Sequence, residues 1–187
     1  MSHLDLLARD QARALMPLTV AQYHRLRDAG WIAEKTELLE GRIIQKTTKS
    51  PRHSTLIGIL QQMLSTHLPD GYLLRKEDPL TLADSEPEPD LCIVRGQLAD
   101  FRDAHPTTAE LVVEVAVTSL ELDRAKTPIY ARAGIPEYWI VRPGSRCIEV
   151  YSEPSATGYG RYREVVAGES FAARWGELDL AILFAEG

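Results

Sequence analysis

The sequence predicts an α/β fold (α+β in some schemes), in which helices flank a mixed central β-sheet. Three observations predict it. The Val-rich apolar run at 111–117 is typical of a strand buried on both faces. Ser50 and Pro51 are typical of a helix start, because Ser caps the first turn and Pro fits its first position. The turn residues Pro143–Ser145 separate two strand-like segments and indicate a hairpin.

Length and composition indicate an ordinary globular protein. The chain has 187 residues, of which 44% are apolar and 26% charged. We expect a single domain over 1–187, with an N-terminal helical extension at 1–17, a core at about 18–151 and C-terminal strands at 152–187. The net charge of −6 argues against a protein that coats DNA without specificity, but it leaves local phosphate contacts open.

The chain carries no apolar run near the roughly 18 residues of a membrane span and no apolar signal core at its start. We therefore expect a cytoplasmic protein. Cys92 and Cys147 lack the spacing of a metal site, and we expect both to be buried thiols.

The helices are predicted from caps and apolar spacing. Thr19 and Gln22 fit a capping box, and Gly30 fits a C-terminal cap. Pro128 must kink or restart the last helix. The predicted helices are 3–16, about 19–29, 50 to about 69, and 119–133.

The strands are predicted from short apolar runs between turn residues. Gly41 turns a strand that begins at Thr36 back on itself. Gly, Ser and Pro residues predict loops at 96–108 and 152–160. The other predicted strands are 72–75, 79–82, 90–95, 110–117, 137–142, 146–151 and 162–167, and an apolar segment at 178–184 closes the chain.

Glu114 lies alone within the apolar run at 111–117. An ionised carboxylate there costs several kcal/mol unless a positive group meets it. Asp90 opens the neighbouring apolar strand, and Lys126 follows shortly after Glu114. Two acids on adjacent buried strands with a nearby Lys are suited to holding a hard divalent cation beside a phosphate.

Structural interpretations of the same residues remain open. Asp90 also fits a turn residue in an acidic loop, and Glu114 also fits a buried carboxylate paired with a basic residue. Lys126 and Glu37 also fit solvated surface residues, and His53 fits an ordinary residue of a helical first turn.

In combination, several short segments resemble the PD-(D/E)XK nuclease superfamily and, more narrowly, a large bacterial family labelled "putative restriction endonucleases". They run in order from about residue 18 to 151. The matching segments are Glu37–Gly41, Pro51–His53, Pro89–Leu91, Val113–Val115, Asp123 with Lys126, Tyr130, and Gly134–Val141.

The resemblance implies a restriction-endonuclease-like αβββαβ core. It implies a Mg²⁺- or Mn²⁺-dependent endonuclease, a hydrolase that cuts the phosphodiester bonds of nucleic acid, with DNA a better candidate than RNA. One position departs from the superfamily pattern, because Ala116 stands where the Lys would be. In the narrower family this Lys is displaced onto the following helix, which here means Lys126.

The resemblance also implies the ligands of the metal. Asp90 and Glu114 would ligate Mg²⁺ or Mn²⁺, which favour oxygen ligands. The carbonyl of Val115 would be a further ligand. Glu37 would complete the shell, directly or through water.

The remaining roles concern the substrate. Lys126 would orient the attacking water or stabilise the developing negative charge. His53, with Arg52, would hold a substrate phosphate at the start of the helix. By the same resemblance, Asp123 and Tyr130 would support the site.

The segment Gly41–His53 contains four basic residues and no acid, which favours either a DNA-contacting edge or a plain solvated face. The resemblance also implies a homo-oligomer, a dimer first, and we expect the strands and aromatic residues near 138–151 to form its interface.

Two alternative functions stay open. Ala116 and the acidic charge favour an inactive nuclease-like domain that binds nucleic acid or a protein, and a satisfied Glu114 would favour a purely structural protein.

Overall fold

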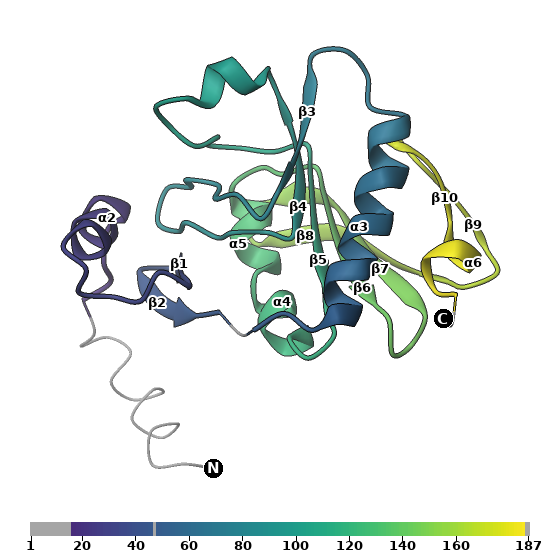
Figure 1. Cartoon of the computed structure of the whole chain (residues 1–187), viewed down its shortest axis with the longest axis horizontal. Helices are drawn as coiled ribbons and strands as arrows, with labels where there is room; N and C mark the ends of the chain where they lie inside the picture. Colours follow the sequence, from purple (N-terminus) through teal and green to yellow (C-terminus); the bar gives the residue numbers. More distant parts are fainter. Residues whose placement is uncertain (1–15, 47, 186–187) are drawn as a thin grey trace, which may run out of the picture.

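The computed structural model describes residues 16–46 and 48–185. The helix expected at 3–16 falls, but for its last residue, outside these ranges. Figure 1 shows a central sheet with helices on both sides and a small helix-and-hairpin unit beside it. The predicted mixed sheet flanked by helices is therefore confirmed.

The central sheet has six strands in the order β3-β4-β5-β6-β7-β8. β5 and β6 run parallel, and every other neighbouring pair is antiparallel. The strands are β3 (Tyr72–Lys76), β4 (Leu91–Arg95), β5 (Leu111–Val115), β6 (Glu137–Arg142), β7 (Cys147–Ser155) and β8 (Gly158–Val166).

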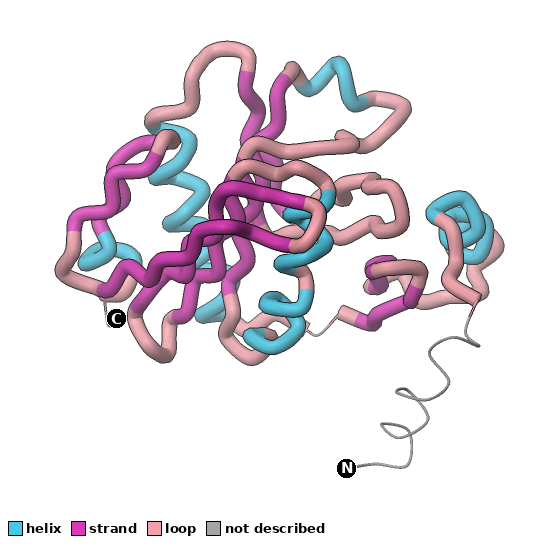
Figure 2. The backbone as a smooth tube through the Cα atoms, turned by 180° about the vertical axis from the view of Figure 1, so that it is seen from behind, coloured by secondary structure: helices cyan, strands magenta, loops and turns pink. Residues whose placement is uncertain are grey.

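Helix α3 (Pro51–Thr66) packs its apolar stripe against one face of this sheet. Beyond it lie β9 (Ser170–Ala173), β10 (Gly176–Asp179) and α6 (Leu180–Leu183) (Figure 1). Helices α4 (Leu120–Ala125) and α5 (Thr127–Arg132) form the crossover between β5 and β6, and α5 packs on the opposite face (Figure 2). The order α3-β3-β4-β5-α4/α5-β6 is the expected αβββαβ core.

A smaller unit precedes this core: α2 (Val20–Asp28) and the hairpin of β1 (Thr36–Leu39) and β2 (Arg42–Gln45). The hairpin turn holds Glu40 and Gly41 at φ of 49° and 74°, the left-handed conformations that a tight hairpin requires. A Cβ on Gly41 would lie 2.3 Å from the Cβ of Pro17, so this position has no space for a side chain. A bridge between Leu38 and Glu86 ties the hairpin to the core.

The local signals explain most helix ends. Thr19 and Gln22 form the predicted capping box of α2. The Ser50 hydroxyl accepts a hydrogen bond from the His53 N–H and caps α3. Pro128 lies in the first turn of α5 and restarts the helix after α4, because Pro fits there and nowhere deeper.

Two predicted segments differ from the structure. Residues 79–82 form no strand. The backbone N–H groups of Leu80 and Thr81 donate instead to the carbonyls of Pro87 and Pro106. Because proline has no N–H group, segments that contain these prolines cannot form the regular hydrogen bonds of a β-ladder. The predicted loop at 152–160 is instead the end of a long hairpin, in which β7 continues to Ser155 and β8 begins at Gly158.

Two of the aromatic residues expected at a dimer interface lie in the interior. Tyr138 and Trp139 are fully buried, so they are not available to a second copy of the chain, while Tyr151 is half-buried. Cys92 and Cys147 are buried free thiols, as expected. Among the helices that the structure describes, none has the length and apolar character needed to cross a bilayer.

Candidate active site

The register of the sheet brings Asp90 and Glu114 together. β4 pairs with β5 so that Leu91 lies opposite Val113. One step further along this antiparallel register sets Asp90 opposite Glu114, and opposite residues point to the same face. The expected position of the two carboxylates, side by side from adjacent strands, follows from this pairing.

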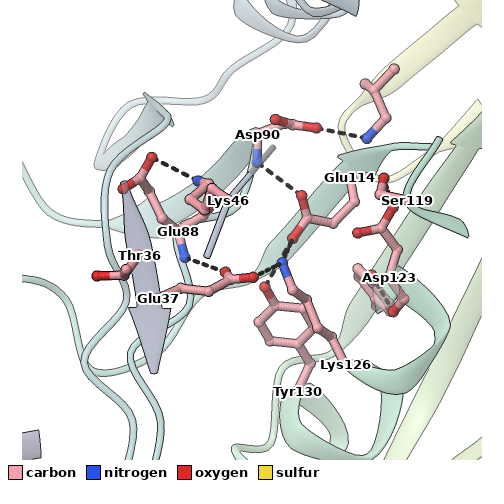
Figure 3. A network of polar contacts seen from close by, with 12 residues as sticks. Thr36, Glu37, Lys46, Glu88, Asp90, Glu114, Ser119, Asp123, Lys126 and Tyr130 are labelled. Atoms are coloured by element: carbon pink, nitrogen blue, oxygen red, sulfur yellow. Dashed lines mark hydrogen bonds and ion pairs between the residues drawn. The ribbon is translucent and has the colours of Figure 1, made fainter. Parts of the chain in front are cut away.

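Each carboxylate binds the backbone of the other strand. The Asp90 N–H donates to Glu114 Oε2 at 3.2 Å (Figure 3). The Val115 N–H donates to Asp90 Oδ2 at 2.8 Å. Asp90 Oδ2 also lies 3.0 Å from His53 Nε2. Oδ2 is thus fully engaged, and Oδ1 is the oxygen of Asp90 that remains for another ligand.

Lys126 lies between Glu114 and Glu37. Its Nζ is 2.9 Å from Glu114 Oε1 and 3.0 Å from Glu37 Oε1 (Figure 3). Lys126 is only 3% exposed, so it is not a solvated helix residue. Lys126 lies at the junction of α4 and α5, and this junction places its ammonium in the pocket. The superfamily pattern that the sequence resembles has its Lys two residues after the Glu, where this chain has Ala116.

The β1–β2 hairpin supplies a second group of charges. Glu37, on β1, is 2% exposed, and its Oε2 accepts the Glu88 N–H at 3.3 Å. Lys46, just after β2, donates to the carboxylate and to the carbonyl of Glu88 at 2.7 and 2.9 Å. Lys49 lies 2.9 Å from Glu77 and 3.5 Å from Asp90 Oδ1.

These residues surround a cavity of about 140 Å³. The cavity lies where β4 and β5 meet the start of α3 and the α4–α5 crossover, with the hairpin unit closing one side. Its lining residues are Glu37, Lys46, Thr48, Lys49, Ser50, His53, Glu88, Asp90, Glu114, Val115, Val117, Thr118, Ser119, Leu122, Asp123 and Lys126.

The acids of the site outweigh its buried cation. Burial raises the pKa of Glu114 to about 8; Lys126 opposes this rise, while Asp123, Asp90 and Glu37 add to it. Burial likewise raises the pKa of Asp123 to about 6, against the opposing effect of Lys126 and the hydrogen bond from Ser119. The whole cavity is lined by five carboxylates and three ammonium groups, so its carboxylates outnumber its ammonium groups.

The pKa values of Asp90 and Lys126 shift in the direction that favours the charged form of each group. Burial alone would raise the pKa of Asp90, but the hydrogen bond and charge of His53, the Val115 N–H and the charge of Lys49 together lower it. Burial would lower the pKa of Lys126, but Glu114, Glu37 and Asp123 raise it well above its usual value. Asp90 is thus held as an anion and Lys126 as a cation.

The donor set fits a hard divalent cation that keeps part of its water shell. Within 16–46 and 48–185, no group of three or more His, Cys, Asp or Glu side chains is arranged to hold a metal ion. Mg²⁺ is ordinarily bound by only one or two carboxylates, with water and phosphate completing its shell. Asp90 and Glu114 match that pattern, and the Val115 carbonyl, which accepts from the Val117 N–H, keeps a second lone pair.

The structure brings most of the predicted site residues together. Asp123 lines the cavity and accepts from the Ser119 hydroxyl at 2.6 Å. The Tyr130 hydroxyl donates to Glu114 Oε1 at 3.3 Å from beneath the pocket. Nδ1 of His53 is buried without a hydrogen-bond partner, while its Nε2 contacts Asp90.

Arg52 is the exception. It precedes His53 on α3, but its guanidinium points to the other side of the helix and donates to the Pro143 carbonyl at 3.3 Å. Adjacent helical residues differ in direction by about 100°, and here this difference turns the Arg52 side chain away from the pocket that His53 lines. Arg52 therefore does not line this cavity.

Sequence reasoning missed several residues of the site. Glu88 and Ser119 were not singled out, although Glu88 lies between the two prolines that precede Asp90. Lys46 and Lys49 were identified as part of a basic segment, but their acidic partners come from a distant loop. Such pairings depend on the hairpin packing, which residue spacing alone does not show.

Comparisons with known proteins gave a match to one family model and a match to a solved structure. The family model Uma2, described as "Putative restriction endonuclease", matches residues 20–180. A crystal structure of "a putative nuclease belonging to DUF820" from Anabaena variabilis ATCC 29413 has the same fold, with a TM-score of 0.74 at 16% identity. The match covers 90% of this chain and 98% of that one. No curated protein matches the sequence.

Proposed function

The chain belongs to the Uma2 family of restriction-endonuclease-like proteins, and from this premise we propose that it is a metal-dependent nuclease. The proposed reaction is hydrolysis of a phosphodiester bond in nucleic acid, with DNA as the first candidate substrate and internal cutting as the first candidate mode. The proposed cofactor is Mg²⁺ or Mn²⁺. The fold that the chain shares with the structure described as "a putative nuclease" supports this proposal.

The pairing of Asp90 with Glu114 carries the proposal. The two carboxylates lie side by side at the edge of a cavity, and the carboxylates that line this cavity outnumber its ammonium groups. Buried acids with perturbed pKa values in a cavity are typical of functional sites. A divalent cation between the two carboxylates would lessen their mutual repulsion.

In this proposal Asp90 Oδ1 and Glu114 hold the cation, with the Val115 carbonyl beside them. When bound, the cation would polarise the scissile phosphate and lower the pKa of the attacking water. Lys126 keeps its charge in the pocket, where it can stabilise negative charge that develops on the phosphate. Glu37 fixes Lys126 from the other side, and His53 fixes Asp90 through Oδ2.

Cleavage assays on paired variants test the proposal. Wild type and Glu114→Gln are incubated with Mn²⁺ and with a set of single-stranded, duplex and branched DNA and RNA substrates. We expect cleavage by wild type that EDTA stops and Glu114→Gln abolishes. Cleavage that persists in Glu114→Gln would exclude this site as its source.

A second candidate is an inactive member of the family that binds nucleic acid or a protein partner. The observation that favours it is the internal pairing of the site's lysines. Lys126, Lys46 and Lys49 each contact a carboxylate of the protein. A protein of this kind binds Mn²⁺ through Asp90 yet leaves every substrate of the set uncut.

A further inference from the structure

Lys49 occupies a particular place at the mouth of the candidate site. It lies in the connection between β2 and α3 and lines the cavity. Its ammonium is 3.5 Å from Asp90 Oδ1 and 2.9 Å from Glu77 Oε1. The side chain is 27% exposed, so it is neither locked in the core nor free in solvent.

The oxygen that Lys49 contacts is the one a metal would need. Asp90 Oδ2 is engaged by the Val115 N–H and by His53. A divalent cation that binds Asp90 must therefore use Oδ1, next to the ammonium of Lys49. Two cations cannot share this oxygen at close range without strong repulsion, so the arrival of one displaces the other.

A phosphate of the substrate is a suitable partner for the displaced ammonium. A phosphodiester bound to the cation places its anionic oxygens at the mouth of the cavity, within the reach of a long flexible Lys side chain. The ion pair with Glu77, at 2.9 Å, does not involve Asp90 and would hold the ammonium at this mouth after Asp90 releases it. We propose that Lys49 is the counterion of Asp90 Oδ1 in the metal-free protein and moves to a substrate phosphate when the divalent cation binds. This inference rests on the proposed function.

Lys46 provides a matched control. It has the same charge, belongs to the same connection and lines the same cavity. Its ammonium, however, is engaged with the carboxylate and the carbonyl of Glu88 and makes no ion pair with Asp90 or Glu114. Lys46→Gln therefore removes an equal charge but leaves the ammonium of Lys49 beside Asp90 Oδ1.

The test uses full-length wild type, Lys49→Gln, Lys49→Arg and Lys46→Gln, each checked for folding by its melting temperature. Mn²⁺ titration calorimetry should show an affinity about tenfold higher for Lys49→Gln than for wild type. Lys46→Gln should show a clearly smaller gain. Lys49→Arg, which keeps the charge, should stay close to wild type.

The phosphate contact is tested with a short DNA duplex in the presence of Ca²⁺ at increasing salt. Removing one phosphate contact should weaken duplex binding by Lys49→Gln and reduce the salt slope by about 1. An unchanged slope, or no duplex binding by wild type, overturns the transfer to phosphate.

The metal titration separates this inference from the proposed function. Equal Mn²⁺ affinities in wild type, Lys49→Gln and Lys46→Gln refute the role of Lys49 and leave the proposed metal site standing. Equal gains in both Gln variants also refute it, because only overall charge then matters. Absence of Mn²⁺ binding in all four proteins refutes the proposed function and this inference with it.

Discussion

Lys126 holds its ammonium 2.9 Å from the carboxylate of Glu114, although the two residues lie 12 positions apart in the chain. In the superfamily pattern the Lys follows the Glu by two positions, where this chain has Ala116. The α4–α5 crossover returns across the sheet and brings Lys126 to the same acid. The ion pair of Glu114 thus comes from the crossover that follows β5 and not from β5 itself.

Loss of Lys126 should destabilise the metal-free protein strongly. Lys126→Met leaves Glu37 and Glu114 buried without their cation, which typically costs about 3 to 5 kcal/mol. Urea unfolding in EDTA at pH 8 measures this loss. The double variant Lys126→Met/Glu114→Gln should recover part of the stability, and a double variant as unstable as the single one would contradict the ion-pair account.

Metal-free stability should fall as pH rises from about 5 to 8. The pKa of Glu114 is raised from 4.5 to about 8 in the folded protein. The folded state therefore keeps a proton that the unfolded state releases across this window. Its unfolding free energy falls by at most about 1.4 kcal/mol per pH unit for this group. Asp123, with a pKa raised to about 6, acts in the same direction at lower pH.

Glu114→Gln should flatten that dependence, because it removes the titrating group and keeps an oxygen for Lys126 and Tyr130. Melting temperatures at several pH values in EDTA provide the comparison. Parallel curves for wild type and Glu114→Gln would mean that Glu114 does not carry the effect. Mn²⁺ should restore wild-type stability most at the upper end of the pH range.

Most of the core could be predicted because its signals are local. Ser50 and Pro51 mark the start of α3, and the continuous apolar run 138–141 marks β6 at Glu137–Arg142. The β7–β8 hairpin could not be predicted in the same way. Pro154 is tolerated near the end of β7, and Glu153 adopts a left-handed φ of 64°, so turn-forming residues there do not end the strand.

The candidate site could be predicted as far as single residues carry their own signal. Glu114 stands out because a charge in a Val-rich strand needs a partner. The position of Arg52 could not be derived from its neighbour His53, because adjacent helical residues face different directions. The contact between Lys49 and Asp90 depends on how the β1–β2 hairpin packs, which no local spacing records.

Neighbouring residues of α3 should therefore behave differently. His53→Ala removes the side chain that engages Asp90 Oδ2, and should weaken Mn²⁺ binding by about tenfold through loss of that positioning. Arg52→Ala should leave Mn²⁺ affinity unchanged, because Arg52 contacts the Pro143 carbonyl outside the cavity. Mn²⁺ titrations of both variants check this, and equal losses would contradict the assignment.

Gly41 should be essential to the hairpin that carries Glu37. Gly41→Ala forces a Cβ to within 2.3 Å of the Pro17 Cβ and places Ala at a φ of 74°. Gly30→Ala is the control, since its φ of 68° costs about 1 kcal/mol but no atom lies within 4 Å of the added Cβ. Thermal unfolding should show a clearly larger loss for Gly41→Ala, and equal losses would mean that the hairpin adjusts freely.

The most direct test of the account is Mn²⁺ titration calorimetry on wild type and Asp90→Asn. The Asn side chain keeps an oxygen for the Val115 N–H, so the strands stay paired while the charge is lost. The account predicts Mn²⁺ binding by wild type that Asp90→Asn abolishes. Equal binding by the two proteins, or none by wild type at millimolar Mn²⁺ with and without nucleic acid, would contradict a divalent-cation site at Asp90 and Glu114.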